Sequence, residues 1–220
     1  MTVTVLLTGF GPFPGVPLNP TQDLVNRLAR IRRPALTGVQ RIAHVFSTSY
    51  VAVDHDLPRL MRRYRPDALL MFGLVSRSRR VRIEMRARNS ASLLHVDVAR
   101  SRASVPRITA LGPSSLPLRA PAKALLAGAR SRRVPAMLSH DAGRYICNYS
   151  YWRGLEAATK PQGPSIVAFV HVPKLRRTWT PHRGRKYRPP AFEDLLHAAE
   201  HMLVTMIAAA RSKNMGRAPG

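Results

Sequence analysis

The feature that most constrains the fold of this chain is a repeated alternation between short apolar runs and longer amphipathic segments. The first run, from Val3 to Thr8, is rich in β-branched residues and is closed by Gly9, which is typical of a buried strand. A loop rich in glycine and proline follows over 9–20, and a helix is expected from there to about Arg30. Strand–helix alternation of this kind predicts an α/β fold with a largely parallel sheet.

The other expected elements continue this alternation. Strands are expected over 39–46, 67–72, 81–88, 134–138 and 166–172, and helices over 51–64, 120–132, 147–158 and 190–211. Segment 90–118 is rich in serine, proline and arginine and is expected to be irregular. No internal repeat or long linker divides the chain, so we expect one domain over 1–211, followed by a flexible tail over 212–220.

The expected sheet also indicates where chemistry should lie. In open parallel sheets, active sites gather just beyond the carboxyl ends of the strands. Three such ends stand out here, namely the loop after Thr8, the turn after Leu138 and the segment after Phe169. Candidate functional residues are therefore expected in these three places.

The charge of the chain raises the question of a nucleic-acid partner. Its 36 lysines and arginines against 11 acidic residues give a net charge of +25, which is typical of proteins that contact polyanions. The arginines are spread along the chain, however, and few aromatic residues lie among them. We therefore favour a solvated basic surface and keep polyanion binding as a secondary hypothesis.

Cysteine content, hydropathy and the N-terminal residues indicate the cellular compartment in which the protein is expected. Cys147 is the only cysteine, which excludes an internal disulfide and a zinc site built from several cysteines. No apolar run approaches the about 20 residues that span a bilayer, so no membrane segment is expected. The N-terminus lacks the charged leader and the small-residue cleavage site of a secretory signal, and a cytoplasmic protein is expected.

Cys147 is the first candidate for chemistry. A strand, a turn at Gly143 and a helical segment would place its thiol at a helix N-terminus. The helix dipole and the free N–H groups there favour the thiolate, which is the form that attacks carbonyl groups. The same N–H groups could hold a developing oxyanion. The alternative is a buried structural cysteine.

His171 and Glu84 are the candidates for the groups that would assist such a thiol. His171 follows a hydrophobic strand and could serve as the base that a cysteine nucleophile needs, or it could be a satisfied core histidine. Glu84 is one of few acids in an arginine-rich stretch. It could orient His171 as the third member of a triad, or it could balance the charge of Arg82, Arg86 or Arg88.

Two other motifs lead to no site. The stretch 197–201 reads His-Ala-Ala-Glu-His and fits a zinc pattern, but no third protein ligand follows it. The glycines of 9–15 are typical of a dinucleotide loop, but Pro12 and Pro14 disrupt the turn into a helix that this loop requires. Neither a metal nor an organic cofactor is therefore expected.

Four blocks of residues resemble one known family. They are Thr8-Gly9-Phe10 with Pro12-Phe13 and Asn19-Pro20; Gly73-Leu74 with Glu84 and Asn89; Ala142-Gly143 with Tyr145, Cys147 and Asn148; and Phe169-Val170-His171-Val172-Pro173. In their order and residue types, these blocks resemble the pyroglutamyl-peptidase I (pyrrolidone-carboxylate peptidase) family.

The resemblance implies a fold and a reaction. The fold would be a single-domain α/β/α sandwich with a twisted, largely parallel central sheet. The reaction would release an N-terminal L-pyroglutamyl residue from peptides through an acyl-enzyme. Cys147 would be the nucleophile, His171 the base and Glu84 the residue that fixes the tautomer of His171.

The resemblance also implies a substrate pocket and an assembly. Because the lactam ring is small and uncharged, its pocket should be apolar. By block position, the pocket candidates are Phe10, Phe13, Tyr145 and Ile146, with Asn19 supporting the loop that carries the two phenylalanines. The expected partners are pyroglutamyl peptides and further copies of the chain, since family members are commonly oligomeric.

Two departures from the family pattern keep a second hypothesis open. The family has Gly-Arg after its Gly-Leu-Ala, where this chain has Ser76-Arg77-Ser78, and its Pro-Phe-Gly-Gly is Pro12-Phe13-Pro14-Gly15 here. With the arginine surplus, these departures would suit a basic polyanion- or nucleic-acid-binding protein on a degenerate peptidase scaffold with little or no turnover. On the peptidase hypothesis, any polyanion contact is expected to be weak and nonspecific.

Overall fold

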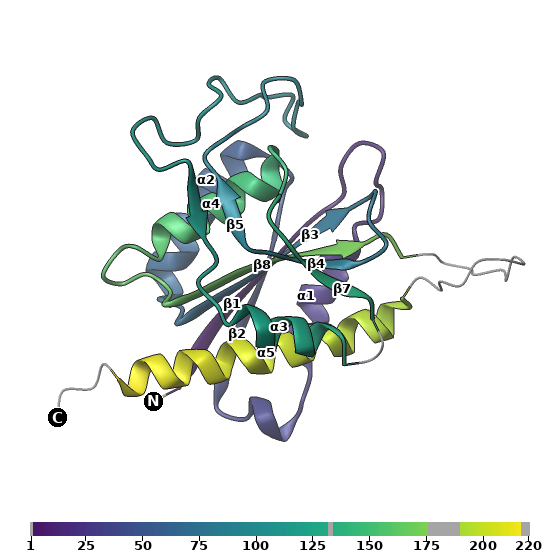
Figure 1. The fold of residues 1–220 in the computed structure, drawn as a ribbon, viewed down its shortest axis with the longest axis vertical. Coiled ribbons are helices and arrows are strands. Elements are labelled where there is room, and N and C mark those ends of the chain that lie inside the picture. Colours follow the sequence, from purple (N-terminus) through teal and green to yellow (C-terminus); the bar gives the residue numbers. More distant parts are fainter. Residues whose placement is uncertain (1, 132–133, 176–189, 217–220) are drawn as a thin grey trace, which may run out of the picture.

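A six-stranded sheet lies at the centre of the structure, a computed structural model that describes residues 2–131, 134–175 and 190–216 (Figure 1). The strand order is β2-β1-β3-β8-β4-β7. These strands are β1 (Val3–Phe10), β2 (Val39–Phe46), β3 (Ala68–Val75), β4 (Val81–Glu84), β7 (Ala136–Ser139) and β8 (Ile166–Pro173). Only the β4–β8 pairing is antiparallel among the pairings of these strands. The expected α/β fold with a largely parallel sheet is confirmed.

Helices cover both faces of the sheet (Figure 1). One face carries α1 (Pro20–Arg30), α3 (Ala122–Ala129) and α5 (Phe192–Met215), and the other carries α2 (Tyr50–Tyr64) and α4 (Ile146–Ala157). A short 3₁₀ helix, η1 (Pro34–Leu36), precedes β2. None of the helices in the described ranges is long and apolar enough to cross a membrane.

The period of two along each strand divides the core between these faces. In β8, Ala168 and Val170 belong to the cluster under α1, α3 and α5, whereas Val167 and Phe169 belong to the cluster under α2 and α4. His171 follows this alternation and points to the face that α4 covers. The fold thus directs a polar side chain from the middle of the sheet toward the helix that begins at Ile146.

The strand expected over 81–88 is divided in two by Met85. The chain leaves the central sheet at this residue: the Met85 N–H still donates to the Ser139 carbonyl of β7 at 2.6 Å, whereas the Met85 carbonyl accepts from the Leu118 N–H, outside that sheet, at 2.8 Å. The second part, β5 (Arg86–Arg88), pairs antiparallel with β6 (Ser115–Pro117) in a separate two-stranded sheet.

The C-terminal helix is longer than expected. Helix α5 continues to Met215, so the tail expected from Ser212 does not begin there, and residues 217–220 lie outside the described ones. The Asn214 side chain donates to the carboxylate of Asp67 at 2.9 Å and holds the last turn against the start of β3.

The direction of β7 also differs from the expectation. Strands β4 and β7 run antiparallel to β8, so the turn after Leu138 does not lie beyond the carboxyl ends of β1 and β8. The connection from β3 to β4 spans only residues 76–80, whereas a parallel crossover needs about a dozen residues or more. Because Ile83 pairs with Val170, the end of β7 lies level with the middle of β8.

Candidate active site

A row of three residues across three strands forms the floor of the candidate site. His171 on β8 is in register with Gly73 on β3 and with Arg82 on β4. Paired residues of neighbouring strands face the same side of a sheet, and Glu84, two residues after Arg82, shares that side. All four positions therefore face α4.

His171 and Glu84 form a buried hydrogen-bonded pair. Nδ1 of His171 lies 2.8 Å from Oε1 of Glu84, and the Glu84 side chain has no exposed surface. Burial alone would lower the pKa of His171, but hydrogen bonds to Cys147 and Glu84 outweigh it and raise this pKa to about 9. The imidazole is therefore protonated at neutral pH and can stand as an imidazolium beside the Cys147 thiol.

Cys147 reaches this pair from the first turn of α4. Its sulfur occupies the space that a side chain at position 73 would fill, since a Cβ built on Gly73 would lie only 2.9 Å from the sulfur. The turn before the helix uses the positive φ of Gly143, +83°, which favours glycine. The N-cap residue Tyr145 makes no side-chain capping hydrogen bond within the described part of the chain, so N–H groups of the first turn can bind a developing negative charge beside the thiol.

Asn148, next to the thiol, fixes α4 against β5. Its amide donates to the carbonyls of Arg88 and Ser90 at 2.8 and 2.9 Å, and its oxygen accepts the Arg88 N–H at 2.8 Å. One turn further on, the hydroxyl of Tyr151 donates to the backbone carbonyl of Glu84 at 3.0 Å. The helix with the thiol and the strand with the carboxylate are thus held together directly.

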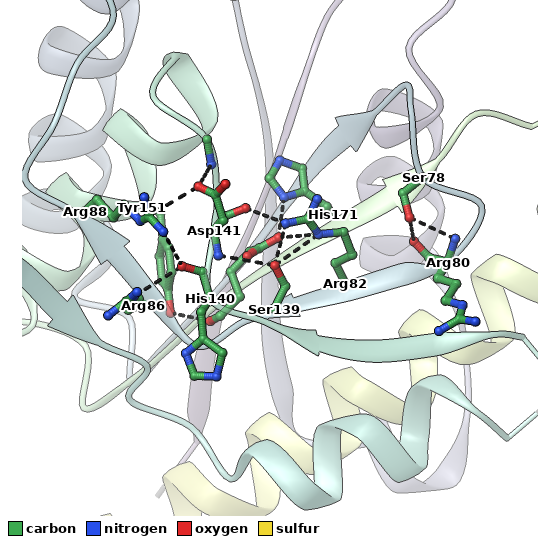
Figure 2. A network of polar contacts seen from close by, with 12 residues as sticks. Ser78, Arg80, Arg82, Arg86, Arg88, Ser139, His140, Asp141, Tyr151 and His171 are labelled. Atoms are coloured by element: carbon green, nitrogen blue, oxygen red, sulfur yellow. Dashed lines mark hydrogen bonds and ion pairs between the residues drawn. The ribbon is translucent and has the colours of Figure 1, made fainter.

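Both sequence interpretations of Glu84 find contacts in the structure. Oε1 of Glu84 accepts from His171 and also lies 3.2 Å from Nε of Arg82. Arg86 and Arg88 instead donate to the carbonyl of His140, at 3.2 and 3.5 Å (Figure 2). Of the three arginines considered as counter-charges, Arg82 is therefore the one that contacts Glu84 in the described part of the structure.

The pocket candidates are only partly gathered in one place. Phe10 and Ile146 are buried in the hydrophobic cluster under α2 and α4, and the half-buried Tyr145 packs against it. The described members of this cluster do not include Phe13, which pairs through its backbone with Val16 in a small turn.

Asn19 holds the loop between the two phenylalanines. Its amide donates to the carbonyl of Gly11 at 3.1 Å, and its oxygen accepts from the N–H and the hydroxyl of Thr21. Asn19 is thereby the N-cap of α1 and a brace for the loop that follows β1.

Segment 90–118 was expected to be irregular; it is so over 90–114, which reaches the start of α4, but residues 115–117 form β6, because they find a partner strand in β5. The hydroxyl of Tyr145 donates to the carbonyl of Val96 at 2.8 Å. Asp97 accepts the backbone N–H of Tyr50, and Tyr50 and Tyr145 meet edge to face with their ring centroids 6.1 Å apart. The loops of this segment therefore lie beside the first turns of α2 and α4 (Figure 1).

Three residues with clear roles in this geometry had none in the sequence analysis. Gly73 and Asn148 stand in the blocks that carry the family resemblance, but only the structure reveals the close approach of the thiol to Gly73 and the tie of Asn148 to β5. Arg82 was considered only as a counter-charge, and its contacts with Ser139 and Asp141 depend on a strand distant in sequence. No local pattern signals any of these contacts.

The zinc-like motif on α5 remains a surface feature. Nδ1 of His197 lies 3.7 Å from the carboxylate of Glu200, which also pairs with Arg33 at 3.0 Å. Within the described ranges, no group of three or more His, Cys, Asp or Glu side chains is arranged to hold a metal ion.

Comparisons with known proteins agree on one family. A family model described as pyroglutamyl peptidase matches residues 3–207. The pyrrolidone-carboxylate peptidase of Cupriavidus pinatubonensis is 28% identical over 93% of both chains, and that of Vibrio vulnificus is 30% identical over 92% of both chains. The crystal structure of pyrrolidone carboxyl peptidase from Pyrococcus furiosus matches with a TM-score of 0.83 at 24% identity, over 94% of this chain and 100% of that one. This last match supports the fold.

Proposed function

The chain belongs to the pyroglutamyl peptidase family, a family of peptidases, and on this basis we propose that it releases an N-terminal pyroglutamyl residue from peptides through an acyl-enzyme on Cys147. The observation that carries the proposal is the 2.8 Å contact between Nδ1 of His171 and Glu84. Because this contact occupies Nδ1, the other ring nitrogen is left for the hydrogen bond with Cys147.

The first half of the reaction forms the acyl-enzyme. The Cys147 thiolate attacks the carbonyl carbon of the pyroglutamyl residue, and the carbonyl electrons move onto its oxygen. Free N–H groups at the start of α4 stabilise that oxyanion. When the oxyanion collapses, the carbon–nitrogen bond breaks, and the His171 imidazolium gives its proton to the leaving amine.

The second half of the reaction restores the thiolate. The now neutral His171 takes a proton from a water molecule, which attacks the thioester carbonyl. The carbon–sulfur bond breaks, pyroglutamate leaves, and the imidazolium–thiolate pair is formed again. Throughout both halves, Glu84 accepts the Nδ1–H of His171 and thereby keeps the other ring nitrogen directed at the sulfur.

The hydrophobic cluster beside the thiol suits the lactam ring. Phe10, Tyr145 and Ile146 belong to this cluster or pack against it, and Cys147 packs against it as well. A lactam has no charge, so apolar walls do not penalise it, whereas a free amino group would lose its hydration there. Asn19 supports this arrangement through the loop after β1, where we place Phe13 at the rim.

A fluorogenic pyroglutamyl amide tests the proposal. We expect hydrolysis that iodoacetamide abolishes completely, because Cys147 is the only thiol in the chain. The matched control substrate is the glutaminyl amide, which carries a free amino group in place of the lactam and should be a poor substrate. Activity that survives full alkylation would remove Cys147 from the mechanism. Loss of activity in EDTA that zinc restores would instead support a site at His197 and His201.

A further inference from the structure

The carboxylate of Glu84 has no exposed surface, and both of its described partners of opposite charge contact the same oxygen atom. A buried carboxylate favours its neutral form unless opposite charge and hydrogen bonds compensate for the lost hydration. Oε2 of Glu84 is buried and has no hydrogen-bond partner among the described residues. The compensation therefore rests on Oε1, which contacts both His171 and Arg82.

The two partners of Oε1 differ in a way that matters during turnover. His171 loses its positive charge when it protonates the leaving amine, so its support for the carboxylate is interrupted in each cycle. The guanidinium of Arg82 stays charged at any pH at which the protein functions. Its side chain is only 23% exposed, which limits the screening of this charge by solvent.

The same guanidinium also holds the chain segment that leads to the thiol. Nε of Arg82 donates to the hydroxyl of Ser139 at 3.1 Å, and Nη2 donates to this hydroxyl and to the carbonyl of Asp141 (Figure 2). Residues 140–145 connect β7 to α4, whose second residue is Cys147. One side chain therefore contacts both the carboxylate and the approach to the nucleophile.

We propose that Arg82 is a positioning residue of this peptidase site, which keeps Glu84 ionised while His171 is neutral and fixes segment 139–141 ahead of Cys147. The proposal rests on the proposed function. Arg82 touches neither substrate nor a reacting atom, and it acts through Glu84 and through the backbone of the segment.

The charged and titratable groups that face His171 define the electrostatic consequence. Among the described residues, they are Glu84 and Cys147, which interact with His171 directly, and Arg82, which pairs with it in register; Tyr145 and Tyr151 act on Cys147 and Glu84 in turn, and β3 contributes Gly73. Burial raises the pKa of Tyr145 to about 12 and that of Tyr151 further, so both stay neutral. Removing the positive charge of Arg82 should therefore raise the pKa values of both the thiol and the imidazolium.

The test compares Arg82→Gln, which removes the charge, with Arg82→Lys, which keeps the charge but not the fork of donors. For Arg82→Gln we expect kcat/KM to fall by about 10- to 100-fold and both limbs of its pH profile to move up by about one unit. For Arg82→Lys we expect a lower kcat at similar KM, with both limbs in place. The control is Arg86→Gln, since Arg86 contacts the same segment at His140 without a described contact to Glu84, and its profile should match the wild type.

Two further measurements keep the outcome decisive. Titration of the thiolate by its ultraviolet absorbance needs no substrate, so it tests Arg82 even if pyroglutamyl hydrolysis fails. In a Glu84→Gln background, the Arg82→Gln shift should shrink, because Arg82 acts through that carboxylate. Unshifted limbs in a folded Arg82→Gln variant would overturn the proposal. If the Arg82→Gln variant does not fold, the Arg82→Lys variant provides the test. A wild-type kcat in Arg82→Lys would overturn the role of Arg82 in positioning segment 139–141.

Discussion

Gly73→Ala would test the placement of the nucleophile most directly. The new methyl carbon would lie 2.9 Å from Sγ of Cys147 and 2.7 Å from Cζ of Phe169. Atoms in van der Waals contact are about 3.5–4.0 Å apart, so the neighbours must move by roughly 1 Å. The ring of Phe169 is fully buried between those of Tyr151 and His171, at centroid distances of 5.5 and 4.9 Å, and has little room. The thiol is therefore the group that moves.

Two magnitudes follow from this displacement. Overpacking of a buried site costs about 1–3 kcal/mol, so the free energy of unfolding should fall by that amount. A misplacement of about 1 Å in a catalytic constellation costs about 10²-fold in rate, so kcat should fall by roughly that factor. The rate of alkylation by iodoacetamide should fall as well, because the displaced thiol loses its hydrogen bond with His171.

Gly154→Ala is the matched control. Its methyl carbon would lie 2.8 Å from Cδ2 of Leu69 and 3.2 Å from Sδ of Met71, so it overpacks the same helix against the same sheet, about two turns beyond Cys147. We expect a measurable loss of stability with most of the activity retained. The assays are hydrolysis of a pyroglutamyl amide and urea unfolding. Wild-type kcat in a folded Gly73→Ala variant would refute the placement of the sulfur over this strand.

The other predictions concern the pair, its titration, the tie to β5 and the surface charge. Cys147→Ala and His171→Ala should each abolish turnover, whereas Glu84→Gln should leave a measurable kcat with KM little changed; an unaffected kcat would remove Glu84 from the site. In a pH profile, kcat/KM should fall as the pH rises through about 9, because the imidazolium that protonates the leaving amine is lost, and a rate that keeps rising there would contradict this role. Asn148→Ala removes three hydrogen bonds to part-buried backbone groups, of which only the Arg88 carbonyl keeps a second described partner, the Ser90 N–H, and it should lower the urea-derived free energy of unfolding by about 2–4 kcal/mol, against a negligible change for the exposed Arg144→Ala. DNA binding should be weak and vanish at moderate salt in a filter-binding assay, since salt-resistant binding would require more than counterion release.

Local patterns in the sequence were sufficient for most of the elements but not for their pairing. The strand over 39–46 has the bounds that its apolar run predicts, because a period of two is a property of neighbouring residues. The division at Met85 and the direction of β7 depend on contacts with Ser139 and with β8, which are distant in sequence. The short connection over 76–80 was the one local signal that β4 could not run parallel to β3.

The candidate site was predictable to a similar extent. A resemblance to a family suffices to name Cys147, His171 and Glu84, and the structure places them within one contact network. The resemblance does not distinguish an orienting carboxylate from a counter-charge, and in the structure Glu84 contacts both a histidine and an arginine. The dependence of the thiol on Gly73 could not be foreseen either, since it arises from the packing of α4 on β3.

The position of β8 between β3 and β4 has a consequence for how the protein folds during its synthesis on the ribosome. Strands β3 and β4 are joined by residues 76–80 but are not neighbours, because β8, made about ninety residues later, separates them. While the ribosome is still adding the residues before Ile166, both strands present unpaired edges that invite pairing with other nascent chains. The strand that carries His171 therefore closes the sheet and brings the base to the site in a single late step. A chaperone that shields these edges during translation would be expected to raise the yield of folded protein.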